Sequence, residues 1–333
     1  YITNVGLQCT PDLGVTLPLD AGAPVAIMAL DEKVVLLTSR KVFVVYGTGP
    51  TPSGSFNNYS APQEIPSDVG CSDGRSVLRV PSGIIFKATK GWHLLGRDLT
   101  VQYVGGGAAR WDGSAVTSAV LMENVAECRF TTDDGVTLVY DYRHNQWSYF
   151  QKTLGLSYVP VDAVWWPTAG NGAGRYVHIS LANGLNQENP GVYTDQPGGL
   201  AAVGLVWTAK TAWLRLERLE RFQRVRKVFL TGTVNAAPTS TLTISVDYDD
   251  ADVGVAPGSY SFTVATATAF AGWAGASADL RHKLRRQKCK SVAFTFSETA
   301  AAGASRLAGI QALALEVGIK RGVARLPSSQ SVG

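Results

Sequence analysis

The first two hundred residues repeat one pattern: a short apolar strand, a glycine-centred turn, a second strand, and a polar or Gly/Pro-rich break. The clearest copies cover 76–95 and 127–150, and looser copies cover 25–50 and 161–195. A repeat of roughly fifty residues with several short strands in each unit is typical of β-propeller blades. Because one such sheet cannot bury both of its faces alone, the pattern predicts sheets that cover one another.

The pattern changes near residue 204. Apolar and polar residues there alternate with a period of two in six segments, which are 205–216, 224–230, 241–248, 260–264, 291–296 and 310–317. This alternation predicts half-buried strands, and its spacing favours an antiparallel β-sandwich. We therefore expect an all-β chain, with a propeller over 1–203, a sandwich over 204–322 and a loose polar tail over 323–333. Within the propeller, the Pro-, Ser- and Asn-rich segment 47–74 is expected to be a long ordered connector.

Composition supports a folded chain with a sizeable core. Of the 333 residues, 45% are apolar and 17% are charged, which argues against disorder. The net charge of +4 is mild and does not by itself require a nucleic acid or a membrane. The sequence has no apolar run of about 18 residues, so no membrane span is expected. It opens on no signal-peptide pattern, and it begins with Tyr1, which fits either a processed protein or a piece of a longer one.

Residues that carry catalysis or bind metals are scattered. The four histidines fall in no HxxxH or HExxH spacing, and the sequence has no G-x-S-x-G. The four cysteines form no CxxC pair and are interpreted as free thiols. The acidic run 247–252 departs from an EF-hand loop and is interpreted as a strand-end turn, with a cation site as the alternative. We expect no cofactor and no enzymatic activity.

The strongest chemical signal is basic clustering, with six Lys or Arg residues in 215–227 and six in 281–290. In an extended strand, Arg281, Lys283 and Arg285 share one face. Such a face can neutralise phosphates without reading bases, can pair with the acidic surface of a neighbouring subunit, or can form ion pairs within the chain. The candidates for an interface or a DNA channel are Arg224, Arg226, Lys227, Arg281, Lys283, Arg285, Arg286 and Lys288.

Several short strings follow one another in order along 25–325. They include VGC at 69–71, DGRSV at 73–77, PSGIIF at 81–86, KGWHLLGRDL at 90–99, FQRVRKV at 222–228, RQKC at 286–289 and LEVGIKRG at 315–322. This series resembles the tail hub, or nozzle, proteins of short-tailed bacteriophages and their prophage relatives.

The resemblance implies a structural virion protein, made in the host cytoplasm, with a propeller and further β domains. In that family six copies form a tube below the portal and its adaptor ring. The tube conducts DNA during ejection, without sequence preference, and carries fibres or spikes. The resemblance carries over no catalytic residues. In that family the propeller sits within a longer chain, which the first residue Tyr1 also fits.

Two alternatives remain open. One is a carbohydrate-binding or glycan-processing propeller, in which Trp-rich loops would stack on sugars and a pair of carboxylates roughly 5–10 Å apart would act as acid and base. Its candidates are Asp133, Asp134, Asp141 and Asp162. The other is a propeller scaffold in a cellular complex.

Overall fold

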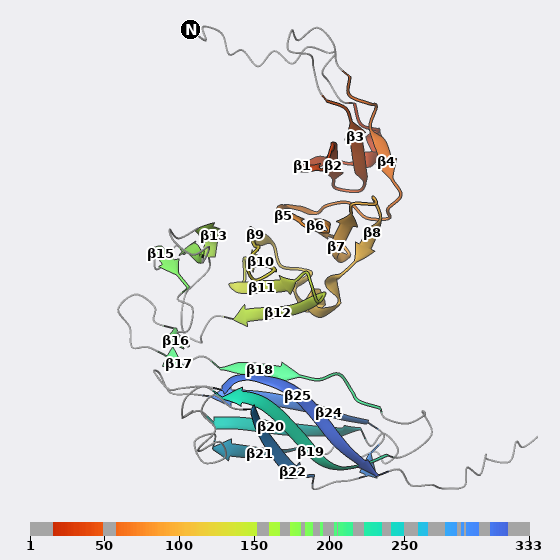
Figure 1. The fold of residues 1–333 in the computed structure, drawn as a ribbon. Coiled ribbons are helices and arrows are strands. Elements are labelled where there is room, and N and C mark those ends of the chain that lie inside the picture. Colours follow the sequence, from red (N-terminus) through yellow and green to blue (C-terminus); the bar gives the residue numbers. More distant parts are fainter. Residues whose placement is uncertain are drawn as a thin grey trace, which may run out of the picture. The chain divides into compact units, whose positions relative to one another are not determined.

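The structure is a computed structural model. It describes residues 16–48, 58–151, 160–166, 174–180, 184–188, 194–195, 203–204, 206–215, 223–234, 241–249, 259–265, 277–284, 288–289, 291–299 and 307–318. The chain divides into two compact units, 1–190 and 191–333, and each unit is described by itself. The described residues are mostly β-strand, which confirms the all-β prediction (Figure 1).

The first unit contains small antiparallel sheets in which each strand pairs with its neighbour in sequence. The first sheet holds β1 (Pro24–Leu30), β2 (Lys33–Thr38), β3 (Val42–Tyr46) and β4 (Gln63–Ile65). The second holds β5 (Asp73–Val80), β6 (Gly83–Ala88), β7 (Gly91–Gly96) and β8 (Val101–Tyr103). The third holds β9 (Val116–Met122), β10 (Glu127–Thr132), β11 (Val136–Asp141) and β12 (Gln146–Gln151), and the fourth holds β13 (Pro160–Trp166), β14 (Arg175–Ser180) and β15 (Gly184–Gln187). Among its described residues, this unit also has two 3-10 helices, η2 (Leu19–Ala21) and η3 (Gly105–Trp111).

Consecutive sheets of this unit pack against each other through apolar faces. One core cluster, with Leu37 and Phe86, joins the first sheet to the second. Another joins the second sheet to the third, where the rings of Trp92 and Phe130 lie 4.3 Å apart between centroids. A third cluster, around Tyr176, joins the third sheet to the fourth. The first strand of each sheet lies next to the first strand of the following one, so the predicted repeat corresponds to sheets that cover one another.

The glycine-centred turn of the clearest repeat has a steric basis. Gly83 follows the turn between β5 and β6 and has φ +155°, a conformation that L side chains rarely adopt. A Cβ added there would overlap with the backbone carbonyl oxygen of Leu95 in β7. The close approach of these strands therefore requires glycine at this position.

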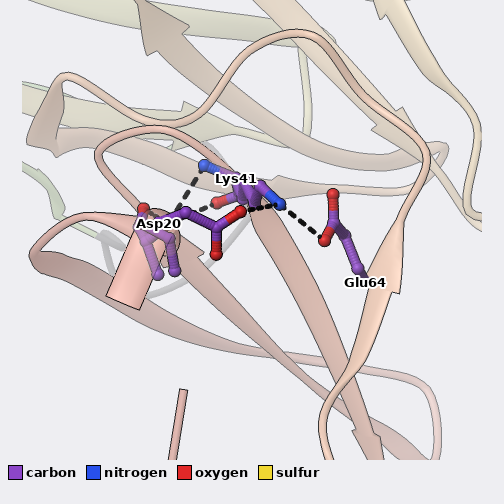
Figure 2. Close-up of polar contacts among 5 residues, drawn as sticks. Asp20, Lys41 and Glu64 are labelled. Carbon is purple, nitrogen blue, oxygen red and sulfur yellow. Dashed lines mark hydrogen bonds and ion pairs between the residues drawn. The ribbon is translucent and has the colours of Figure 1, made fainter. Parts of the chain in front are cut away.

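Lys41, between β2 and β3, connects η2 to β4 of the first sheet. Its Nζ lies 2.7 Å from Asp20 Oδ2 in η2 and 2.8 Å from Glu64 Oε2 in β4 (Figure 2). The hydrogen bond from Lys41 holds the pKa of Asp20 below its usual value. Glu64 lies in the predicted connector 47–74. This connector contains β4, whose Ile65 is buried. Its residues 49–57 lie outside the described part of the chain.

In the described part of the second unit, the strands form two four-stranded antiparallel sheets and a short pair, β16 (Thr194–Asp195) and β17 (Val203–Gly204). One sheet has the order β18 (Trp207–Lys210), β24 (Ser291–Thr299), β20 (Thr241–Asp249) and β21 (Ser259–Ala265). In the other, β19 (Gln223–Val234) pairs with β22 (Ser277–Lys283), β23 (Lys288–Cys289) and β25 (Leu307–Gly318).

Both sheets contribute to one apolar core. Leu242, Ile244 and Val246 alternate with more exposed neighbours along β20, as the period-two pattern predicts, and pack in one cluster with Val228 of β19 and Phe294 of β24. The alternating sequence pattern therefore identified the core-facing residues of β20. Across the part of the chain that the structure describes, no helix has the length and apolar content needed to cross a membrane.

Candidate functional site: a basic sheet face

Basic residues from both sequence clusters meet on one face of the sheet β22–β19–β25. Lys227 of β19 lies opposite Lys283 of β22, and Phe229 lies opposite Arg281. Residues that lie directly opposite each other in an antiparallel pair point to the same face, and so do alternate residues along a strand. These four side chains therefore share one face, while Val228 between them is buried in the core on the other.

A β-bulge adds a further cation to this face. The register between β19 and β25 shifts between Val225 and Lys227, so Arg226 is the extra residue in β19. Val225 and Val228 both remain buried, and Arg226 is exposed. Gly318 of β25 leaves room for it, because a Cβ there would lie 3.0 Å from Arg226 Nε. The bulge thus presents Arg226 and Lys227 together without removing a residue from the core.

Neighbouring side chains hold two of the cations in place. Lys227 Nζ lies 2.8 Å from Glu316 Oε2 of β25, and this hydrogen bond lowers the pKa of Glu316. The Arg281 guanidinium lies 5.6 Å from the ring centroid of Phe229, in a cation–π arrangement. Arg281 and Lys283 are both exposed. We define the basic face as Arg226, Lys227, Arg281 and Lys283.

Four other basic residues were candidates in the sequence, and the structure describes the backbone of two of them, Arg224 and Lys288. The backbones of Arg224 and Lys288 lie opposite each other where β19 meets β23. Arg285 and Arg286 lie outside the described residues. Arg281 and Lys283 thus share a strand face as expected, and the role of the other candidates stays a prediction.

The carboxylates considered for glycan processing make turn-forming contacts. Asp133 Oδ1 accepts a hydrogen bond from the Ala115 amide at 3.0 Å. Asp141 Oδ1 accepts one from the Arg143 amide at 2.9 Å, and its Oδ2 lies 2.7 Å from His144 Nδ1. Contacts of this kind are those that Asp makes at the ends of strands and in turns, so they indicate a structural role.

The other two glycan-processing candidates behave in the same way. Asp134 accepts hydrogen bonds from the hydroxyls of Thr132 and Ser114 at the turn between β10 and β11. Asp162 Oδ1 accepts one from the Ala163 amide at 2.8 Å. Each of these carboxylates therefore has a local structural partner.

A buried lysine that the sequence pattern does not single out, Lys87, lies between the second and third sheets. Lys87 Nζ donates to the backbone carbonyls of Trp111, at 3.3 Å, and of Ser114. Burial lowers the pKa of Lys87, and nearby carboxylates offset part of this effect. These carboxylates are Asp73, Asp112, Asp133 and Asp134. The only signal in the sequence was one charged residue in the otherwise apolar strand β6.

The second sheet carries an open hollow of about 590 Å³. Across it, Lys90 Nζ lies 2.6 Å from Asp68 Oδ2, and the side chain of Tyr103 is exposed. The hollow is lined by Pro66, Ser67, Asp68, Lys90, His93, Val101 and Tyr103. Asp68 and Lys90 are thus paired with each other at the hollow, beside the exposed ring of Tyr103.

Comparisons with known proteins identify no family. No family model matches this chain. No curated protein matches it either. Among solved structures, the chain is similar to an exo-β-1,3-galactanase from Phanerochaete chrysosporium with β-1,3-galactotriose, at 11% identity and a TM-score of 0.27. The match covers 87% of this chain and 79% of that one. A likeness this low supports no argument about function.

Proposed function

We propose that this chain is a structural subunit of a ring-forming assembly, the tail hub or nozzle of a short-tailed bacteriophage or prophage. In this proposal six copies surround a channel in the virion tail, adjoin the portal-adaptor ring and anchor fibres or spikes. DNA passes through the channel during ejection and its sequence is not read. The ordered strings of the sequence suggest the kind of assembly, and the basic face is the observation that supports contact with DNA.

The spacing of the basic face suits a phosphate backbone. Alternate residues of one strand lie roughly 6.8 Å apart, and neighbouring strands lie roughly 4.8 Å apart. Successive phosphates of one DNA strand rise about 3.4 Å along the axis, and their distance through space is longer because the strand winds around that axis. Arg281 and Lys283, at alternate positions of β22, can therefore contact phosphates of one DNA strand, with Lys227 beside them on β19. The bound carboxylate of Glu316 moderates the attraction, which favours weak contact and passage of the DNA.

We also propose that the sheets of the first unit are consecutive propeller blades and that the sheets of the second unit form a sandwich. Strand order along each sheet follows the chain, and neighbouring first strands lie side by side, as in propeller blades. In the second unit, two four-stranded sheets share one apolar core, as the halves of a sandwich do.

The DNA contact can be tested by fluorescence anisotropy with a labelled duplex of random sequence, titrated between 25 and 200 mM salt. We expect weak binding that does not depend on sequence, with a slope of log K against log salt of about −2 to −4 for two to four phosphate contacts. Arg281→Glu combined with Lys283→Glu should weaken binding at least about tenfold and reduce the slope by about 2.

A matched control changes the net charge equally in the first unit, where Arg75 and Arg79 are exposed in β5. Arg75→Glu with Arg79→Glu should leave most of the affinity. Equal losses in the two double variants would mean that net charge alone attracts DNA. Sedimentation of the wild-type chain tests the ring, because a monomer at every concentration would contradict the assembly.

The carbohydrate alternative is favoured by one observation, the hollow beside Tyr103. Titration calorimetry of the purified chain against oligosaccharides tests it directly. Binding that Tyr103→Ala abolishes would support a sugar site at the hollow. The absence of both binding and hydrolysis at millimolar sugar would count against it.

A further inference from the structure

The fourth sheet of the first unit has an apolar face that is open to solvent. Leu185 of β15 lies opposite Ile179 of β14, and Val164 and Trp166 of β13 alternate on the same face. Their exposed fractions are 49% for Val164, 62% for Trp166, 49% for Ile179 and 71% for Leu185. We call these four residues the trailing face. Large apolar side chains that gather on an exposed face often mark interaction sites.

The opposite face of the same sheet is already used. Ala163, Trp165 and Tyr176 pack against Val120 and Met122 of the third sheet. The fourth sheet therefore carries large apolar side chains on both faces, as a sheet covered on both sides does. One of its faces has a partner in the chain, and the trailing face has apolar residues together with Asp162, Arg175 and Gln187.

At the other end of the series, the first sheet leaves part of one face open, along β1 and β2. On β3 the same face is covered, because Phe43 and Val45, which lie opposite Leu36 and Val34, are buried. Ile27 of β1 is 70% exposed and lies opposite Leu36, which is partly exposed. Ala29 is exposed and lies opposite Val34 on the same face. We call these four residues the leading face. The other face of this sheet covers the second sheet through the cluster that contains Leu37.

We infer that the trailing face of one copy covers the leading face of a second copy, so that the series of sheets continues from chain to chain. Within the unit, each sheet already packs one face against the next sheet in the chain, and the first strands of the two sheets lie side by side. The trailing and leading faces are the two ends of this series, so they could pack against each other in the same way. Their exposed residues show that they do not do so within one chain. This inference rests on the proposed assembly and names its contact.

The geometry of such a contact has a consequence for the assembly. The trailing and leading faces are different surfaces, so the contact is head to tail. A head-to-tail contact generates a ring when the rotation closes and a filament when it does not. A contact of one face with itself would instead stop at a dimer.

Complementary blocked variants test this directly, with the full chain and analytical ultracentrifugation. Trp166→Glu with Leu185→Glu blocks the trailing face, and Ile27→Glu blocks the leading face. Each variant alone should be monomeric, with association weakened at least about a hundredfold. An equal mixture should form a one-to-one pair and nothing larger, because each variant retains one working face. Val125→Glu, at an exposed apolar residue in the turn after β9, should assemble like the wild type.

Folding is checked by circular dichroism, and the milder Leu185→Ser should weaken association without adding charge. Dimers formed by the Ile27→Glu variant alone would show that the trailing face pairs with itself and would overturn the head-to-tail contact. Wild-type oligomers that survive both blocks would overturn this contact while the proposed assembly stands. A wild-type chain that stays monomeric would overturn both the head-to-tail contact and the proposed assembly. The proposed DNA contact would then be tested separately, by the salt dependence of DNA binding.

Discussion

Arg129 links the third and fourth sheets, and its replacement tests how they are held together. Its side chain is 8% exposed, and its guanidinium pairs with Glu127 at 3.1 Å and with Glu188, which follows β15. It also lies 4.9 Å from the ring centroid of Tyr176 and 5.3 Å from that of Phe150. Burial lowers the pKa of Arg129, but Glu188 and Glu127 outweigh burial and raise it. The guanidinium is therefore charged and paired at any physiological pH.

The expected cost of Arg129→Met follows from these contacts. An ion pair with a half-exposed carboxylate such as Glu188 contributes about 1 kcal/mol. Contacts of a desolvated guanidinium with aromatic rings contribute roughly 1–2 kcal/mol. Methionine fills much of the same volume, so a cavity adds little. We expect a loss of about 2–3 kcal/mol, which lowers the melting temperature of a unit of this size by roughly 4–12 °C.

Hydrogen exchange measured by mass spectrometry can assign this loss to the first unit. Peptides that cover β10 and β14 should lose protection in Arg129→Met, whereas those that cover β20 should not. Arg129→Lys should lose an intermediate amount of stability, because the lysine ammonium keeps the positive charge but lacks the planar guanidinium that contacts several groups at once. A double-mutant cycle with Glu188→Gln should give a coupling near 1 kcal/mol. A cycle without coupling, or a loss below about 0.5 kcal/mol in Arg129→Met, would refute the reasoning.

Three other measurements probe the first unit. Gly83→Ala should lower the free energy of unfolding, measured with a chemical denaturant, by about 2–4 kcal/mol, because of the positive φ of Gly83 and the crowding around it. The control Gly106→Ala, in open space, should change this free energy little. Equal losses in the two variants would contradict the reasoning. Burial raises the pKa of Cys128 to about 12, so iodoacetamide at pH 8 should label it only after unfolding, as peptide mass spectrometry can show. The hydrogen bond from His144 lowers the pKa of Asp141, so the stability that this carboxylate adds is present above about pH 4 and is lost as the pH falls through its lower folded pKa. In Asp141→Asn, the free energy of unfolding should therefore fall less as the pH drops below about 4. An unchanged fall at acid pH would argue against a stabilising contact between Asp141 and His144.

The fold could be predicted where local pattern and turn chemistry agree. The turn before Gly83 marks a hairpin in the sequence, and the alternation over 241–248 identifies the core side of β20. Strand β22 was not among the alternating segments, because its charged residues interrupt the period-two pattern, although Arg281 and Lys283 were considered as part of an extended strand. Its place in the sheet is set by its partner β19, about fifty residues earlier, and a single sequence carries no direct signal of that pairing.

The candidate site was predictable only in part, for a similar reason. The spacing of Arg281 and Lys283 is enough to place both on one face. The position of Arg226 depends on a bulge, and the partner of Lys227 is Glu316, 89 residues away. Lys87 gave no sign of its carbonyl partners, Trp111 in η3 and Ser114 before β9, because those contacts are made by backbone atoms, which any residue type has.

The difference in strand order between the units has a consequence for synthesis on the ribosome. In the first unit, each pairing joins strands that are adjacent in the chain, so a hairpin can form soon after its residues emerge. In the second, β18 must wait for β24 and β19 must wait for β25, near the end of the described chain. Contacts between such distant segments form slowly, since long loops must close first. The amino-terminal sheets are therefore complete while β18 and β19 still lack their partners, and in that interval the newborn chain is most vulnerable to proteases and to aggregation.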